Sequence, residues 1–98
     1  MDMARQLKQS MSTGSVLFGQ RQTMSACSRG DARIVIVAAN CPVNYISELT
    51  DGHPDVPVHQ VQMVNSQLGA ACAKPFSVSA LCVTDPGESE LLSLSPNV

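Results

Sequence analysis

The run Ile34-Val35-Ile36-Val37-Ala38 constrains the fold of this chain more than any other feature of the sequence. Every residue in it is apolar, and all but the last are β-branched. A continuous apolar run of this kind is typical of a strand that is covered on both faces by helices. It therefore predicts a central strand in the parallel or mixed sheet of an α/β protein.

Helical patterns occupy four other segments, each bounded by a residue that starts or stops helices. The expected helices run from Asp2 to Ser12 with Asp2 as N-cap and Gly14 as terminator, from Gln20 to Arg29 before Gly30, around Ser47 to Leu49 with an end near Gly52 and Pro54, and from a cap at Asn65 or Ser66 to a stop before Pro75.

Three more segments have the composition of strands: Ser15–Phe18, Val56–Val61 and Phe76–Val83. Asp85-Pro86-Gly87 is a turn by composition, and Glu88 to Leu94 is expected to form a last helical turn. Alternation of strands and helices at this spacing predicts a three-layer α/β/α sandwich around a mixed sheet of about four strands. We expect one domain that spans residues 1–98.

The length and the motifs of the chain limit the classes of function that it can have. A chain of 98 residues has room for one core, which disfavours an enzyme with separate substrate domains. No sequence pattern nominates a catalytic group, a cofactor or a metal. The four cysteines form no C-x-x-C pair, His53 and His59 fit no ligand spacing, and the loop from Gly14 to Gly19 lacks the lysine of a phosphate-binding loop. The cysteines are expected to act as small apolar residues in a reducing compartment.

The chain has no basic-then-apolar leader and no stretch of about 20 apolar residues, so we expect a cytoplasmic protein without a membrane partner. Its net charge of -2 disfavours a generic nucleic-acid binder. An electropositive N-terminal half nevertheless remains open, because the basic residues gather before residue 48: Arg5, Lys8, Arg21, Arg29 and Arg33.

Four sequence words, in order, match one family. They are Thr13-Gly14-Ser15-Val16-Leu17-Phe18-Gly19 with Thr23, then Ile34-Val35-Ile36-Val37-Ala38-Ala39-Asn40-Cys41-Pro42, then Leu68-Gly69-Ala70-Ala71-Cys72-Ala73-Lys74, and finally Asp85-Pro86-Gly87-Glu88-Ser89. In these words the chain resembles the archaeal and eukaryotic large-subunit ribosomal protein thirty family, within the superfamily of kink-turn RNA binders. The resemblance covers about residues 7–92 and implies a non-catalytic ribosomal protein whose partners are ribosomal RNA and neighbouring ribosomal proteins.

The resemblance also implies that three loops converge at one end of the sandwich and hold a sharply bent RNA. The RNA-binding residues that follow from it are Gly19, Gln20, Arg21, Thr23, Asn40, Pro42, Lys74, Phe76 and Val78. Their chemistry suits the role. Free amides at the helix start after Gly19 meet phosphate, Asn40 hydrogen-bonds base edges or sugars, and Phe76 offers a face to an unstacked base.

The chain departs from the family pattern where the site is expected. Ser25, the stretch from Asn44 to Ile46, and Ser77 stand where the family usually has basic residues, and Met63-Val64 replaces a stretch rich in glycine and asparagine. Alternatives therefore remain: Asn40 as a turn former, Phe76 as a filler of the sheet edge, a kink-turn protein of a small ribonucleoprotein, or a diverged paralogue that binds proteins through its acidic C-terminal half.

Overall fold

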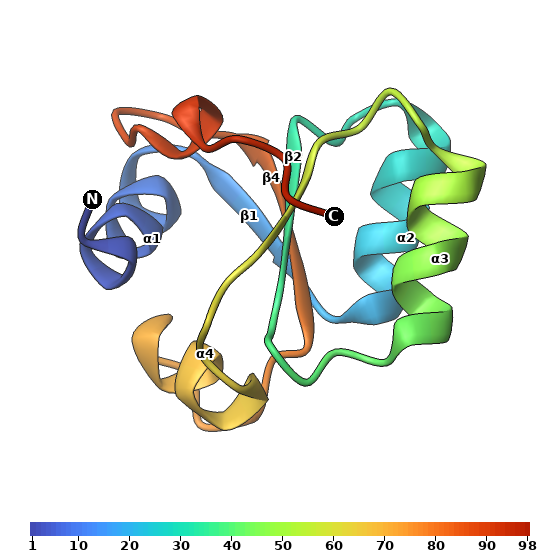
Figure 1. The fold of residues 1–98 in the computed structure, drawn as a ribbon. Helices are drawn as coiled ribbons and strands as arrows, with labels where there is room; N and C mark the ends of the chain where they lie inside the picture. The colour runs from blue at the N-terminus through green and yellow to red at the C-terminus, as the bar shows by residue number, and fades with distance from the viewer.

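The computed structural model describes all 98 residues and contains one mixed sheet flanked by helices on both faces (Figure 1). The elements are α1 (Met3–Thr13), β1 (Ser15–Phe18), α2 (Gln20–Arg29), β2 (Ile34–Val37), α3 (Val43–Gly52), β3 (Val58–Gln60), α4 (Asn65–Ala71), β4 (Ala80–Asp85) and the 3-10 turn η1 (Leu91–Ser93). The predicted three-layer α/β/α architecture with four strands is confirmed.

Strand β2 lies in the interior of the sheet, as its composition predicts. The strand order is β1-β4-β2-β3, and all four residues of β2 are buried. Ile34 and Ile36 belong to the core beneath α1, α4 and η1, whereas Val35 and Val37 belong to the core beneath α2 and α3. The continuous apolar run is therefore explained, because each face of β2 meets its own helical layer.

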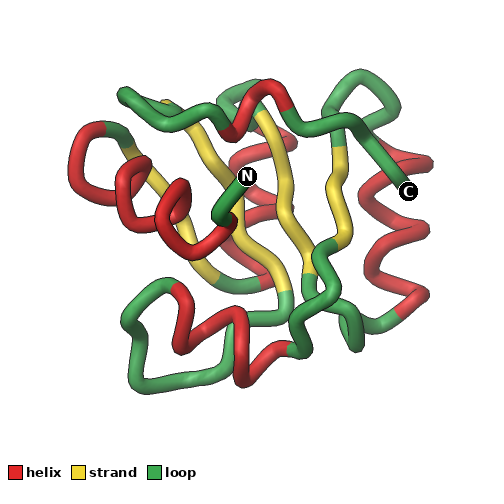
Figure 2. The backbone as a smooth tube through the Cα atoms, turned by 60° about the vertical axis from the view of Figure 1, so that its left-hand side comes forward, coloured by secondary structure: helices red, strands yellow, loops and turns green.

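The direction of the strands decides where the loops gather. Strand β3 is parallel to β2, while β4 is antiparallel to both β2 and β1. The carboxyl ends of β1, β2 and β3 therefore meet the start of β4 at one end of the sheet, which we call the rim (Figure 2). Two loop hydrogen bonds close this end: Gly19 N donates to Ala80 O at 2.9 Å, and Ala38 N donates to Ser79 O at 2.9 Å.

Helix boundaries at the start of the chain agree with the sequence. Asp2 caps α1, where its Oδ1 accepts the N–H of Arg5 at 3.3 Å, and Gly14 ends the helix. Helix α2 runs over Gln20–Arg29 and ends at Gly30, whose φ of 78° is the left-handed conformation that favours glycine. Helix α3 continues to Gly52, the end expected from the glycine and proline that follow.

Several predicted boundaries are wrong. Strand β4 begins at Ala80 instead of Phe76, because Val78 N donates to Asn65 O and holds the preceding residues in a loop. Helix α4 is capped at Val64 and not at Asn65 or Ser66, since Gln67 Oε1 accepts the N–H of Val64 at 3.0 Å. Strand β3 spans only Val58–Gln60, shorter than the predicted Val56–Val61.

The first and the last of the four family motifs, which begin at Thr13 and at Asp85, meet at the end of the sheet opposite the rim. Glu88 N donates to Thr13 Oγ1 at 2.9 Å, and Thr84 Oγ1 donates to Ser15 O at 3.2 Å. A side chain at Gly14 would lie only 2.1 Å from Asp85 O, so the two turns touch through their backbones. Two of the four family motifs thus join α1 and β1 to β4 at this end of the sheet.

All four cysteines are free and buried. Burial raises the pKa of Cys72 to about 11 and that of Cys82 to about 12, and it also raises the pKa of Cys27 and Cys41. Neutral thiols of this kind pack as small apolar groups. No helix is both long and apolar enough to cross a bilayer.

Candidate nucleic-acid interface

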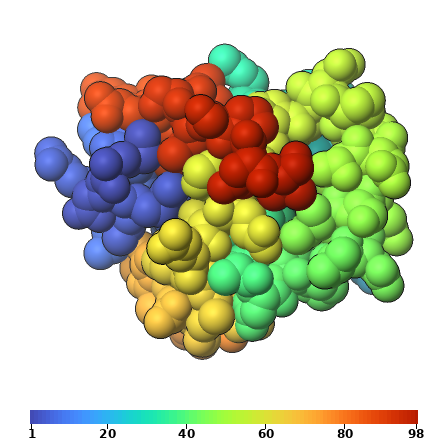
Figure 3. All heavy atoms as spheres, viewed as in Figure 1, coloured from blue at the N-terminus to red at the C-terminus, as the bar shows by residue number.

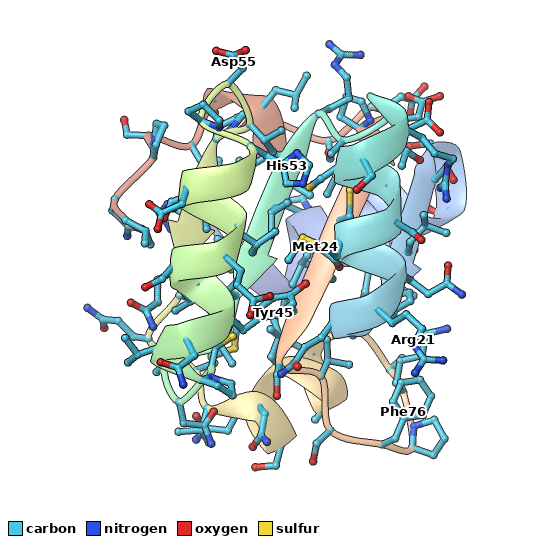
Figure 4. The ribbon with its side chains drawn as sticks, turned by 90° about the vertical axis from the view of Figure 1, so that its right-hand side faces the viewer. Arg21, Met24, Tyr45, His53, Asp55 and Phe76 are labelled. Carbon is cyan, nitrogen blue, oxygen red and sulfur yellow. The ribbon has the colours of Figure 1, made fainter.

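Three loops meet at the rim, as the family resemblance implies for a binding site. They are the junction of β1 and α2 at Gly19, the loop between β2 and α3 that contains Asn40 and Pro42, and the loop between α4 and β4 that contains Lys74 and Phe76. Backbone hydrogen bonds join the first two loops to the residues just before β4 and at its start. Figure 4 shows Arg21 and Phe76 near one another at this end. Gly19, Asn40 and Phe76 therefore lie at the same end of the sheet.

The start of α2 is open to an anion. Gly19 adopts φ 100°, a conformation that L side chains rarely take, and no side chain caps the helix. Amide groups of the first turn of an uncapped helix point outward and carry partial positive charge. Gln20 and Arg21 occupy this turn, and Arg21 is exposed. A phosphate at this position would meet backbone N–H groups and a guanidinium together.

Asn40 links the loop between β2 and α3 to the start of α4 through two hydrogen bonds. Its Oδ1 accepts the N–H of Asn65 at 2.8 Å, and its Nδ2 donates to Asn65 Oδ1 at 3.1 Å. Asn65 also holds the third loop, because its carbonyl accepts the N–H of Val78 at 3.0 Å. One pair of asparagines thus fixes the positions of the β2–α3 loop, the start of α4 and the loop before β4. Asn40 remains exposed, so its second amide hydrogen is free to meet a ligand.

We expect Asn40→Ala to lower the free energy of unfolding by about 1 kcal/mol, because the substitution removes two hydrogen bonds from an exposed pair. Urea denaturation measures the change. Asn44→Ala is the matched control, since Asn44 is an exposed asparagine of the neighbouring α3, and its cost should stay within about 0.5 kcal/mol. Equal stability of the two variants would contradict the bracing role.

Phe76 projects from the loop between α4 and β4 and is 53% exposed. It therefore does not fill the sheet edge. The loop packs directly on α4: a side chain at Gly69 would lie 2.1 Å from Phe76 O. Lys74 N donates to Gly69 O at 2.9 Å, so the same glycine holds both ends of this short segment. An aromatic ring displayed on a backbone held this way is prepared to stack on an unpaired base.

Lys74 is held by an aromatic ring from another element. Its Nζ lies 4.7 Å from the centroid of the Phe18 ring, within the range of a cation–π contact. Phe18 is the last residue of β1 and directly precedes Gly19. The contact therefore places the ammonium group near the open start of α2, on the same end of the sheet as Arg21. Pro42 is exposed in the remaining loop, before the start of α3.

Two predicted contacts are buried. Thr23 and Val78 are 0% and 1% exposed, so neither side chain reaches the surface of the rim. Both support it from inside, Thr23 from the first turns of α2 and Val78 from below the Phe76 loop. The remaining residues of the predicted set lie at the rim with at least part of their surface accessible: Gly19, Gln20, Arg21, Asn40, Pro42, Lys74 and Phe76.

Sequence reasoning missed the residues that position the site. Tyr45 Oη donates to Gln20 O at 2.6 Å and ties α3 to the start of α2. Burial, reinforced by the neighbouring Cys27 and Cys41, raises the pKa of Tyr45 well above its usual range, so the phenol stays a donor. Asn65 and Gly69 hold the loops described above. Tyr45 is the only tyrosine in the chain, and this rarity was the one sequence signal that could have pointed to its positioning role.

Basic and acidic residues are separated between the two ends of the sheet, and not between the two halves of the chain. Arg29 and Arg33 lie at the end opposite the rim, where Arg29 Nε pairs with Asp31 at 3.0 Å, so the basic residues of the N-terminal half do not form one face. The loops and helix ends of that opposite end carry most of the acids: Asp31, Asp51, Asp55, Asp85 and Glu88. The rim keeps Arg21 and Lys74 without an acid on its three loops.

A shallow hollow of about 590 Å³ adjoins the rim between α2 and α3. Its lining includes Arg21, Met24 and Tyr45, which Figure 4 shows along this face. The hollow contains one acid, Glu48, and no histidine or cysteine. Nowhere in the chain do three or more potential metal ligands gather. The geometry suits recognition of a ligand at the rim.

Comparison with known proteins finds relatives over most of the chain. Residues 1–93 match the profile of the ribosomal protein L7Ae/L30e/S12e/Gadd45 family. The large ribosomal subunit protein eL30 of Methanosphaerula palustris is 45% identical over 94 residues, which cover 96% of this chain and 97% of that protein. The eL30 protein of Methanospirillum hungatei is 40% identical over 95 residues, covering 97% and 99%.

A solved structure supports the fold independently. The structure of a protein of unknown function from Bacillus halodurans superposes with a TM-score of 0.79 at 24% sequence identity. The match covers 94% of this chain and 93% of the other. At this level of identity the likeness concerns the architecture alone.

Proposed function

Because the chain belongs to the ribosomal protein L7Ae/L30e/S12e/Gadd45 family, we propose that it is a structural protein of the large ribosomal subunit that binds kinked or bulged ribosomal RNA through its rim. The archaeal relatives that it resembles over nearly their whole length carry the name of that subunit. The function is recognition and not catalysis, its place is the cytoplasmic ribosome, and its partners are ribosomal RNA and ribosomal proteins. Residues 1–98 act as one RNA-binding domain.

The convergence of three chemically different groups on the rim is the observation that carries the proposal. Gly19 opens the start of α2 for a phosphate, Asn40 keeps a free amide hydrogen, and Phe76 displays its ring. Sharply bent RNA presents the matching features, because bending crowds phosphates and releases bases from the stack. A straight duplex offers no unstacked base to Phe76.

The proposal is tested by binding of the purified chain to a kink-turn RNA and to a straight duplex of equal length at low salt. We expect clear preference for the kink-turn. Absence of RNA binding at low salt, where electrostatic attraction is strongest, would contradict the proposal and favour a protein-binding paralogue.

Arg21 and Lys74 give a second expected result. The double variant Arg21→Gln/Lys74→Gln should bind the kink-turn more weakly and with a flatter salt dependence. The slope of log K against log salt should fall by about 0.7–0.9 for each phosphate that is no longer neutralised. Arg33→Gln is the control, because Arg33 is an exposed arginine that precedes β2 at the opposite end. An equal fall of the slope in the control would place the RNA elsewhere.

A further inference from the structure

The C-terminal tail lies against the outer edge of β3 and runs toward the rim. Figure 2 shows it passing beside that strand, and Figure 3 shows it packed on the surface next to the segment that follows β3. His59 Nδ1 lies 2.9 Å from Ser95 O, which fixes the start of the contact. The tail follows η1, whose Leu91 is fully buried and anchors the approach. The matched family profile ends at residue 93, before this segment.

Asn97 alone engages three polar groups on the outer edge of β3. Its backbone N–H donates to Val58 O at 3.2 Å. Its side-chain Oδ1 accepts the N–H of Gln60 at 2.6 Å, and its Nδ2 donates to Gln60 O at 3.0 Å. The side-chain amide of Asn97 therefore pairs with both backbone groups of Gln60, as the peptide group of a neighbouring strand would do. Gln60 is held on its outer side by the tail.

The side chain of Gln60 extends in the other direction, to the β2–α3 loop. Its Nε2 donates to Ala38 O at 3.1 Å and to Ala39 O at 3.3 Å. Ala39 directly precedes Asn40, and Ala39 N donates to Met63 O at 2.8 Å. These bonds fix the backbone just before Asn40. A continuous series of hydrogen bonds thus runs from Asn97 through Gln60 to the loop that presents Asn40 at the rim.

We propose that Asn97 and Gln60 are positioning residues for RNA binding, and that the C-terminal tail holds the Asn40 loop in its binding geometry without touching the RNA. The inference rests on the proposed function, because it concerns the same rim. A binding loop that is fixed in advance loses less conformational freedom when the ligand arrives. Release of the tail from β3 should therefore weaken binding through the loop and leave the neutralisation of phosphates unchanged.

The test compares full-length Asn97→Ala, Asn97→Asp and wild-type protein for kink-turn affinity across a salt series. We expect Asn97→Ala to bind about three- to tenfold more weakly with an unchanged salt slope, because no cation is removed. Asn97→Asp keeps an oxygen acceptor for Gln60 N–H but replaces the Nδ2 donor with an oxygen that repels Gln60 O, so its affinity should fall at least as far as that of Asn97→Ala. The control is Ser95→Ala, because Ser95 is exposed in the same tail and contacts His59 through its backbone carbonyl, which the substitution keeps.

Hydrogen exchange separates this inference from the proposed function. The amide of Gln60, and with it that of Ala39, should exchange faster in Asn97→Ala than in the wild type, whether or not RNA is present. A wild type that binds the kink-turn beside an Asn97→Ala variant that binds equally well would overturn the inference alone. Unchanged exchange at Gln60 and Ala39 would overturn it too. Failure of the wild type to bind RNA would instead overturn the proposed function.

Discussion

Gly69→Ala is expected to lower the free energy of unfolding by about 1–3 kcal/mol and to weaken kink-turn binding roughly tenfold or more. The added methyl group would lie 2.1 Å from Phe76 O, a backbone atom that cannot rotate away. Either α4 or the loop that carries Phe76 must therefore move. Because Lys74 N also bonds to Gly69 O, the movement displaces the aromatic ring and the ammonium group together.

Gly52→Ala is the matched control for this substitution. Gly52 also lies in a helix, α3, but a side chain there would meet no atom within 4 Å. It should leave RNA affinity unchanged and raise stability slightly, by about 0.4–1 kcal/mol, since alanine restricts the unfolded chain. Thermal unfolding and gel-shift titration of both variants check the two expectations. A Gly69→Ala protein with wild-type stability and affinity would show that the loop does not depend on the close packing.

Phe76→Ala is expected to reduce RNA affinity by about 1–3 kcal/mol while changing stability little. The ring is 53% exposed, so its removal leaves no cavity in the core. Loss of a stacked base should therefore appear in the dissociation constant and not in the unfolding curve. Isothermal calorimetry with the kink-turn RNA, together with urea denaturation, measures both quantities on one sample.

Two further variants sharpen that result. Phe76→Tyr keeps an aromatic ring and should bind like the wild type, whereas Leu92→Ala removes an exposed apolar side chain from η1, outside the three loops. An unchanged dissociation constant in folded Phe76→Ala, or an equal loss of affinity in Leu92→Ala, would remove Phe76 from the proposed site.

The sequence predicted the fold wherever a local signal decides the structure. Asp2, Gly14 and Gly30 mark helix ends through their own backbone or side-chain chemistry, and β2 reveals itself by its unbroken apolar run. The predicted start of β4 was wrong because Phe76-Ser77-Val78-Ser79 alternates like a strand. Its conformation is set by Asn65 and by contact with Gly69, which are tertiary effects that no local pattern contains.

The candidate site was predictable in part. Resemblance supplied the three loops, and the strand directions bring them to one end as expected. The sequence did not reveal that Asn40 uses both ends of its amide to bind Asn65, because the partner is 25 residues away. Nor did residue type alone distinguish the exposed Arg21 from the buried Thr23, since helix orientation against the sheet decides which side chain faces outward.

The hydrogen bond from Tyr45 to the start of α2 has a spectroscopic consequence. The chain has one tyrosine and no tryptophan, so its intrinsic fluorescence and near-ultraviolet dichroism are dominated by a single phenol. That phenol contacts the carbonyl of Gln20, one residue beyond Gly19. The protein thus carries its own optical reporter beside the rim, one that senses local events at this helix start without any attached dye.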